Sequence, residues 1–321
     1  GLKKDFPLGG KRVIGTPAHY AYLKIAEGCN NCCTYCAIPM IRGGFRSVPM
    51  EDVLEEAKWL AEHGVTELTV IAQDTTRYGE DLYGESRLPE LLEQLCRIQD
   101  IRWIRVLYCY PERITDKLLE VMAREEKLVK YLDIPIQHCN GDILRRMNRQ
   151  GDADTLAALL DKIRRMIPDI TLRTTLITGF PGETEAQFTE LAEFVQAQRF
   201  DRLGCFAYSQ EEGTKAAEFP DQVPEDVRQH RADILMEQQQ LIVEEKNNAK
   251  LGQVCTAVIE GYDRWAECWF GRTAADAPDI DGKVFIRSET PLNIGDYVTV
   301  RLDEVLDYDF VGEVVTDESA Q

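Results

Sequence analysis

The sequence is short of positive charge. It holds 37 lysines and arginines against 56 aspartates and glutamates, which gives a net charge of −19. A protein that binds nucleic acid through its phosphates usually has a basic face. The balance therefore argues against nucleic acid as the main partner, although it leaves room for a local basic patch, and it favours a basic protein instead.

The sequence also lacks any long apolar run. No stretch approaches the roughly 18 residues that a membrane-spanning helix needs, and no secretory signal pattern opens the chain. Its 10 cysteines are scattered through 321 residues rather than arranged as the disulfide framework of a small secreted domain. These absences predict a cytoplasmic protein without membrane contact, whose cysteines serve a metal rather than disulfides.

A third shortage concerns the ligands of a cysteine-rich loop. Cys29, Cys33 and Cys36 follow a C-x3-C-x2-C spacing, with Cys32 as an extra thiol, but no fourth cysteine at matching spacing and no histidine lies nearby. A structural zinc site needs four ligands. Three thiolates can instead each bind a different iron of one cubane cluster. The pattern predicts a 4Fe-4S cluster with one open iron, and Cys32 is expected to point away from it.

From residue 20 the pattern alternates between strands and helices. Six short apolar stretches predict strands: Tyr20–Ala26, Leu68–Ala72, Trp103–Leu107, Tyr131–Ile134, Thr171–Ile177 and Arg202–Ala207. The predicted helices of this region are Met50–Glu62, Arg87–Ile98, Thr115–Arg124, Asp142–Met147, Asp154–Met166 and Glu183–Gln198. This alternation is typical of a parallel sheet covered by helices. Six repeats are too few for an eight-stranded barrel, so we expect an α/β fold with an open, partial (β/α)6 TIM-like barrel, whose site lies at the carboxyl ends of the strands.

The composition changes after a long polar helix over residues 224–251. Short β-like runs between Gly, Asp and Pro turns predict a small all-β domain, roughly a five-stranded barrel: Val254–Ile259, Lys283–Ile286, Tyr297–Leu302 and Phe310–Val315. From residue 252 onward, five basic residues stand against fifteen acidic ones, a balance of −10. Such a domain would repel RNA phosphates and attract a basic protein, unless its acidic surface is merely solvated.

The cysteine loop resembles that of the radical S-adenosylmethionine (SAM) superfamily, which carries C-x3-C-x2-C after a strand. The resemblance implies that SAM chelates the open iron, and that one electron then cleaves it to methionine and a 5′-deoxyadenosyl radical. The stretch Ile38-Pro39-Met40-Ile41-Arg42-Gly43 resembles the methylthiotransferase branch, which adds sulfur and a methyl group to an unactivated carbon. Within it, Arg42 holds an anionic group, caps the site or makes a structural salt bridge.

Two further stretches resemble the RimO-type methylthiotransferases. One is Asp74–Gly79, and the other is Ile134-Pro135-Ile136-Gln137-His138 together with Leu144-Arg145-Arg146-Met147-Asn148-Arg149. At Gln137-His138 the tRNA-modifying members tend to have P-x-Q-S. The resemblance implies that a methylthio group is added to the β-carbon of an aspartate in small-subunit ribosomal protein twelve. The alternative is the same chemistry on tRNA adenosine. His138 is an acid–base group, an orienting group or simply structural, and no residue is assigned a certain catalytic role.

The resemblance also implies contacts to SAM around the loop. Tyr35 is expected near the adenine, although an aromatic side chain there would equally shield the cluster from water. Gln73 and Asp74 end a predicted strand, where the superfamily places polar groups for the methionyl amine. Any polar strand end would look similar.

A second implied group of SAM contacts lies after the fifth predicted strand. Ile177, Gly179 and Glu183 are implied to pack on the adenine and ribose, while a plain turn followed by a favourably charged helix start explains the same residues. Arg173 on this strand is implied to reach the SAM carboxylate or a substrate.

The small all-β domain resembles a TRAM domain, an oligonucleotide-binding-like barrel, at Gly295-Asp296-Tyr297-Val298 and Tyr308–Val314. We therefore expect a linker from a preceding domain at 1–19, the radical SAM barrel at 20–223, a connecting helix at 224–251, the TRAM domain at 252–316 and a tail at 317–321. In the family, a preceding domain holds three cysteines and a second 4Fe-4S cluster. None of the remaining cysteines repeats that spacing, so this cluster, needed for full activity, is expected only upstream of residue 1.

The resemblance implies two protein partners. One is the basic ribosomal protein, bound through the acidic TRAM domain, and the other is an electron donor such as flavodoxin or ferredoxin. A rival interpretation of another class is a non-catalytic metal-binding module with zinc or a structural cluster at the cysteine loop. The six-strand pattern and the Gly179–Glu183 strand end argue against it.

Overall fold

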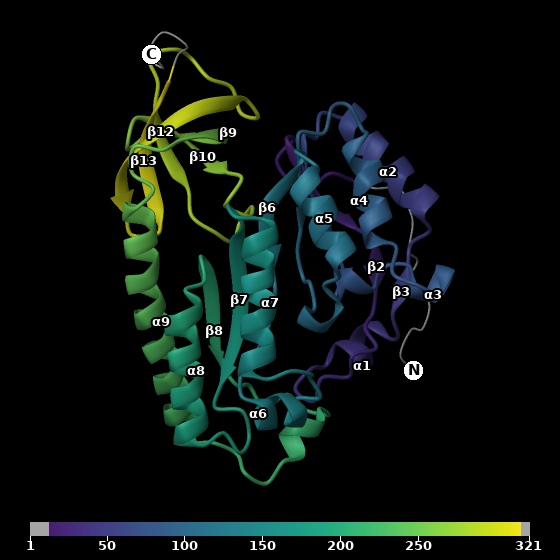
Figure 1. Ribbon diagram of the computed structural model, residues 1–321. Coiled ribbons are helices and arrows are strands. Elements are labelled where there is room, and N and C mark those ends of the chain that lie inside the picture. Colours follow the sequence, from purple (N-terminus) through teal and green to yellow (C-terminus); the bar gives the residue numbers. More distant parts are fainter. Residues whose placement is uncertain (1–12, 316–321) are drawn as a thin grey trace.

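One six-stranded sheet organises the computed structural model, which describes residues 13–315 (Figure 1). Its strand order is β1-β4-β5-β6-β7-β8, and every neighbouring pair is parallel. The strands are β1 (Tyr20–Lys24), β4 (Glu67–Ile71), β5 (Trp103–Val106), β6 (Leu128–Asp133), β7 (Thr171–Thr178) and β8 (Arg202–Ala207). Within the described residues β1 and β8 are edge strands, so the predicted open α/β barrel is confirmed.

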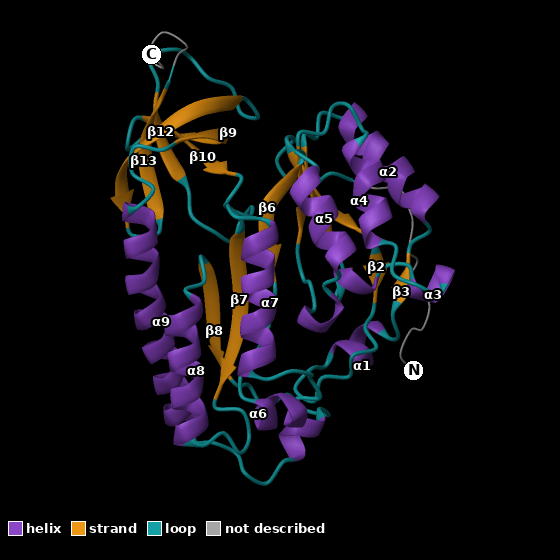
Figure 2. Ribbon diagram, viewed as in Figure 1, coloured by secondary structure: helices purple, strands orange, loops and turns teal. Residues whose placement is uncertain are grey.

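Helices connect these strands and cover the outer face of the sheet (Figure 2). They are α2 (Met50–Glu62), α4 (Leu88–Cys96), α5 (Asp116–Arg124), α6 (Gly141–Arg146), α7 (Ala153–Met166) and α8 (Glu185–Gln198), with short α1 (Ile38–Arg42) and α3 (Glu80–Tyr83). Leu68 and Val70 of β4 join Leu60 of α2 and Leu92 of α4 in the main apolar core. Three single 3-10 turns lie at Thr75–Arg77, Pro111–Arg113 and Lys215–Glu218.

Two predicted elements need correction. The strand expected over Tyr20–Ala26 ends at Lys24, and β2 (Ala26–Glu27) pairs instead with β3 (Arg46–Ser47) in a separate two-stranded sheet. Helix α8 begins at Glu185, because Thr184 is its N-cap and forms a reciprocal capping box with Gln187. Glu183 therefore precedes the helix that it was predicted to open.

The long helix α9 (Glu225–Asn248) leads into a closed five-stranded barrel of order β10-β11-β13-β12-β9. The strands are β9 (Val254–Asp263), β10 (Cys268–Thr273), β11 (Val284–Arg287), β12 (Tyr297–Leu306) and β13 (Asp309–Val314). The sequence predicted four of these strands and missed β10. In the described part of the chain, no helix is long and apolar enough to cross a membrane. The predicted tail at 317–321 and most of the predicted linker lie outside the described residues.

The small barrel packs against the amino ends of the sheet strands. Trp103, which begins β5, meets the ring of Tyr297 edge to face at 4.9 Å, and the hydroxyl of Tyr20 on β1 donates to Asp279 at 2.7 Å. Helix α1, which follows the cysteine loop, lies at the other end of the molecule in Figure 1. The small barrel and the cysteine loop therefore occupy opposite ends of the sheet.

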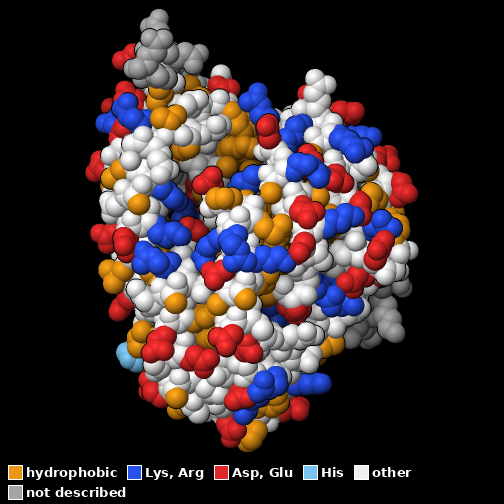
Figure 3. Space-filling model, viewed as in Figure 1, with side chains coloured by type: hydrophobic (Ala, Val, Ile, Leu, Met, Phe, Trp, Pro, Cys, Tyr) orange, Lys and Arg blue, Asp and Glu red, His pale blue; other side chains and the backbone are white. Residues whose placement is uncertain are grey.

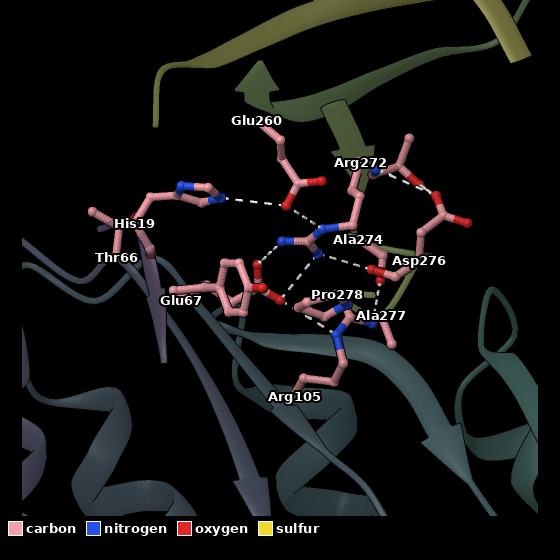
Figure 4. Close-up of polar contacts among 12 residues, drawn as sticks. His19, Thr66, Glu67, Arg105, Glu260, Arg272, Ala274, Asp276, Ala277 and Pro278 are labelled. Carbon is pink, nitrogen blue, oxygen red and sulfur yellow. Dashed lines mark hydrogen bonds and ion pairs between the residues drawn. The ribbon is translucent and has the colours of Figure 1, made fainter. Parts of the chain in front are cut away.

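Buried ion pairs join the two domains at this contact (Figure 4). The side chain of Glu67 is fully buried and accepts hydrogen bonds from Arg272 Nη2 at 2.7 Å and from Arg105 Nε at 3.3 Å. Arg272 Nε also donates to Glu260 Oε1 at 2.7 Å. Because buried charges are tolerated only when paired and hydrogen-bonded, these contacts fix how the barrel sits on the sheet.

Candidate active site

The cysteine loop folds tightly onto the chain segment that leads to β3. Gly28 has a φ of +79°, and a Cβ on it would lie 2.2 Å from the carbonyl oxygen of Gly44. The amide of Cys29 donates to Gly43 O at 3.2 Å, and Asn30 Oδ1 accepts from Phe45 N at 3.0 Å. Only glycine fits the first position of the loop, and this close approach brings the amide of Cys29 against Gly43.

The loop is also held from the opposite side, by the turn after α6. Asn148 Nδ2 donates to the carbonyl oxygens of Asn31 and Cys32 at 2.9 and 3.2 Å. The amide of Thr34 donates to Met147 O at 3.0 Å. Two separate segments thus fix the path of the loop from Cys29 to Thr34.

The three predicted ligand thiols are less exposed than Cys32, the extra thiol of the loop. Cys29 and Cys33 are 7% and 5% exposed and Cys36 is partly buried, whereas Cys32 is exposed and has a φ of +51°. Burial, helped by the nearby Asp74, Cys33 and Cys36, raises the pKa of the Cys29 thiol to about 11. Iron binding would replace these thiol protons.

These residues fit the predicted cluster. Among residues 13–315, no three His, Cys, Asp or Glu side chains converge on a single metal ion. A cubane cluster does not need such convergence, because each thiolate binds a different iron. Three soft thiols on one rigid loop, two of them shielded from water, are the donor set that such a cluster requires.

Tyr110 and Arg149 lie beside Cys33. No individual role was predicted for either, although Arg149 ends the stretch Leu144–Arg149 that resembles the RimO-type members. The hydroxyl of Tyr110 is 3.5 Å from Cys33 Sγ. The guanidinium of Arg149 lies 4.2 Å from the centroid of the Tyr110 ring, and its Nη1 is 3.5 Å from the hydroxyl of Tyr35. Burial raises the pKa of both tyrosines, so their hydroxyls stay protonated.

A cavity of about 240 Å³ opens next to the loop, at the carboxyl ends of β7 and β8. Its lining includes two predicted SAM contacts, Tyr35 and Ile177, and seven other residues: Gln137, Thr175, Phe206, Ala207, Tyr208, Ser209 and Glu211. The side-chain oxygen Oε1 of Gln137 is buried without a hydrogen-bond partner. The cavity is thus a shaped pocket with apolar walls and an unsatisfied polar atom, as ligand sites have.

Gln73 and Asp74 face the cysteine loop rather than this cavity. The carboxylate of Asp74 is fully buried and accepts from Asn31 Nδ2 at 2.8 Å and from Thr76 Oγ1 at 2.6 Å. Gln73 Nε2 lies 3.4 Å from Glu27 Oε1, while its own Oε1 has no partner. Asp74 therefore anchors the loop, and Gln73 keeps a side-chain oxygen that could accept a hydrogen bond from a ligand.

The strand end after β7 packs against α9. A Cβ on Gly179 would lie 2.0 Å from Cγ of Arg228. Glu183 is 5% exposed, accepts from the amide of Gly179 at 2.9 Å and pairs with Arg231 at 2.8 Å. His138 is fully buried with Nε2 3.5 Å from Glu183 Oε2. Gly179 therefore permits the close approach of the Arg228 side chain, which belongs to the protein itself.

The two arginines predicted to hold anions are both paired. Arg173 donates to Asp133 at 2.8 Å and comes within 3.9 Å of Asp281 of the small barrel. Arg42 lies 3.9 Å from Glu27. Arg173 thus lies toward the end of the sheet that faces the small barrel, away from Tyr35 and Ile177.

Comparisons with known proteins agree with this geometry. Residues 23–195 match the Radical SAM superfamily and residues 251–315 the TRAM domain. Three relatives are called ribosomal protein uS12 methylthiotransferase RimO. The protein of Clostridium tetani is 49% identical over 97% of this chain and 70% of its own length. Those of Desulfitobacterium hafniense and Lachnoclostridium phytofermentans are 51% and 52% identical over 95% and 94% of this chain, and 68% of their own length. This chain belongs to the RimO family.

The family membership confirms the radical SAM and TRAM fold that the sequence predicted, together with a 4Fe-4S cluster and SAM as cofactors. Among solved structures, the chain resembles coproporphyrinogen III oxidase (HemN) of Escherichia coli. The TM-score is 0.49 at 21% identity, over 70% of this chain and 52% of that one. The RimO relatives are longer than this chain.

Proposed function

We propose that this chain holds the radical SAM site of a methylthiotransferase that modifies an aspartate β-carbon of ribosomal protein uS12. One observation carries the proposal: the loop that holds the buried thiols of Cys29 and Cys33 also contributes Tyr35 to a cavity that Ile177 lines. In addition, 97% of this chain aligns with a uS12 methylthiotransferase at 49% identity.

In this proposal each group of residues has a separate task. Cys29, Cys33 and Cys36 hold the cluster, which supplies the electron that cleaves SAM when both are bound. The cavity beside Tyr35 and Ile177 takes the adenosine part of SAM. Asp74 and Asn148 hold the loop in place, and the apolar walls keep water away from reactive species. Gln73, Gly179 and Glu183 support this site through the protein contacts described above, whereas Arg173 pairs with Asp133 near the small barrel.

The TRAM domain is proposed to recruit the basic ribosomal protein. Part of its negative charge is neutralised within the protein, because Glu260 and Asp276 pair with arginines at the domain contact. Exposed acids remain at Glu267, Glu289, Glu304 and Asp307. On the face drawn in Figure 3, acidic side chains are interspersed with lysines and arginines rather than gathered in one patch. Recruitment therefore rests on an overall negative field, and tRNA is the disfavoured substrate.

Anaerobic reconstitution with iron and sulfide, followed by SAM and dithionite, tests the proposal. The parent chain is expected to bind the iron of one 4Fe-4S cluster and to release 5′-deoxyadenosine, measured by chromatography. Cys33→Ala is expected to lose both. Cys32→Ala, which removes the exposed thiol of the same loop, is the matched control and is expected to keep both. Failure of the parent chain to take up iron would contradict the proposal.

The substrate is tested separately. The longer RimO relatives leave open whether this chain alone completes methylthiolation, so the readout is binding. Purified uS12 is expected to bind the chain in calorimetry, with an affinity that falls as salt rises, and a tRNA is expected to bind more weakly. Preference for tRNA would favour the adenosine alternative. A one-electron donor of the flavodoxin or ferredoxin class is expected to replace dithionite.

A further inference from the structure

Arg149 is a buried cation without an anionic partner. Its side chain is 4% exposed. Its Nη2 donates to the carbonyl oxygen of Pro135 at 2.9 Å, and its Nε has no hydrogen-bond partner. Among residues 13–315, no carboxylate forms an ion pair with it, whereas the buried Arg105 and Arg272 each pair with Glu67. A buried charge is costly unless a counter-charge is near, so a missing anion is expected beside Arg149.

The position of Arg149 indicates where that anion lies. The guanidinium stacks on the ring of Tyr110 at 4.2 Å, and the hydroxyl of that ring lies 3.5 Å from Cys33 Sγ. On its other side, Nη1 is 3.5 Å from the hydroxyl of Tyr35, which follows Cys33 by two residues. Both tyrosines and the arginine therefore surround the middle thiol of the predicted ligand set.

The hydrogen bond between Tyr110 and Cys33 has only one possible direction once iron is bound. A thiolate ligand has no proton, so the hydroxyl of Tyr110 must donate to the sulfur. A guanidinium over a tyrosine ring is attracted to the face of the ring, and here it brings a positive charge close to the same sulfur. Hydrogen bonds to cluster sulfurs and the net charge around a cluster both set its reduction potential.

We infer that Arg149 and Tyr110 are positioning residues that act through Cys33 to make the cluster easier to reduce. The inference rests on the proposed function, because it needs the cluster on Cys29, Cys33 and Cys36. The hydrogen bond from Tyr110 and the charge of Arg149 both stabilise the added electron, since each offsets negative charge on the sulfur. Removing either group should make the reduction potential more negative.

A redox titration of the reconstituted chain tests this without any turnover. Dithionite supplies the electron, no SAM is present, and electron paramagnetic resonance measures the fraction of reduced cluster. Tyr110→Phe and Arg149→Met are each expected to keep the parent's iron content. At a fixed potential, the ratio of reduced to oxidised cluster is expected to fall about tenfold, which corresponds to about 59 mV for a one-electron couple. Arg149→Lys keeps a charge and is expected to recover part of the shift.

Two controls separate this role from a structural one. Tyr78→Phe removes another buried hydroxyl, which donates to Val48 O at 2.9 Å and touches no thiol, and Arg165→Met removes an exposed arginine on α7. Both are expected to leave the potential unchanged. If Arg149→Met does not fold, Tyr110→Phe, which lacks a single oxygen atom, decides the question.

Two results would overturn the inference. Parent-like potentials in Tyr110→Phe and Arg149→Met with full iron content would show that neither group acts on the cluster. Loss of SAM binding in Arg149→Met, with an unchanged potential of the SAM-free cluster, would assign the arginine to the SAM carboxylate instead. Absence of iron from the parent chain would contradict the proposed function itself, and the inference with it.

Discussion

The buried carboxylate of Asp74 connects the cysteine loop to the sheet. One of its oxygens accepts from Asn31 Nδ2 and the other from Thr76 Oγ1, and Arg113 Nε lies 3.5 Å away. Asp74→Asn turns one acceptor into a donor that faces another donor. An unsatisfied buried group costs about 1–3 kcal/mol, so we expect urea unfolding to show a loss of that size. Iron retained after reconstitution should fall as well, because the loop loses its anchor.

Asp161→Asn provides the control for Asp74→Asn. Asp161 is an exposed residue of α7, so the same loss of charge is expected to change neither unfolding nor iron content by much. Parent-like iron retention in Asp74→Asn would show that the turn after α6 alone can hold the loop.

Helix α9 depends on a glycine at the end of β7. Gly179 has a φ of +67°, and a Cβ there would overlap the side chain of Arg228. Gly179→Ala should therefore push α9 away from the strand end. We expect a fall in the unfolding temperature and a greater sensitivity of residues 225–248 to proteolysis. The amide of Gly179 and the carboxylate of Glu183 would also separate.

Gly252→Ala is the control that separates the effect of backbone strain from the effect of steric overlap. Gly252 has a φ of +81°, but a Cβ on it would meet no atom within 4 Å. Both variants force alanine into the left-handed region, and only Gly179→Ala adds a collision. Equal losses in the two variants would mean that strain alone matters and that α9 can adjust to the added methyl group.

Much of the architecture was predictable from local patterns. Buried apolar stretches such as Leu68–Ile71 alternate with amphipathic helices, and that alternation specifies a parallel sheet. Strand β10 was missed because its buried residues include Gly271 and Arg272, which do not suggest a core strand. Arg272 is buried because it meets Glu67, which is 205 residues away in the sequence. A pairing of that kind leaves no local signal.

The candidate site shows the same limit. The C-x3-C-x2-C spacing locates the loop from sequence alone, because the three ligands are close in the chain. Arg149 and Tyr110 reach the loop only through the fold. Two signals were available: Tyr110 follows the end of β5 and Arg149 follows the helix α6, and Arg149 also ends the stretch Leu144–Arg149 that resembles the RimO-type members. Side chains just beyond the carboxyl ends of parallel strands come together at the edge of the sheet where ligands bind.

At the scale of the whole molecule, the small barrel and the cysteine loop lie at opposite ends of the sheet. Tyr20 and Trp103 contact the barrel near the amino ends of their strands, while the candidate SAM cavity opens at the carboxyl ends of β7 and β8. If the acidic barrel recruits the substrate, as proposed, that substrate must extend along the molecule to place a side chain at the cavity. This favours an extended protein segment over a compact substrate.

The fixed position of the barrel depends on Glu67. Glu67→Gln removes the buried negative charge between Arg105 and Arg272, and Arg272 keeps only Glu260 as an anionic partner. Removing one partner of a buried ion pair typically costs about 3–5 kcal/mol, and urea unfolding is expected to show a loss in this range. The exposed Glu126 is the control: Glu126→Gln should stay close to the parent. A similarly small loss in Glu67→Gln would mean that the apolar contact of Trp103 with Tyr297 holds the domains together.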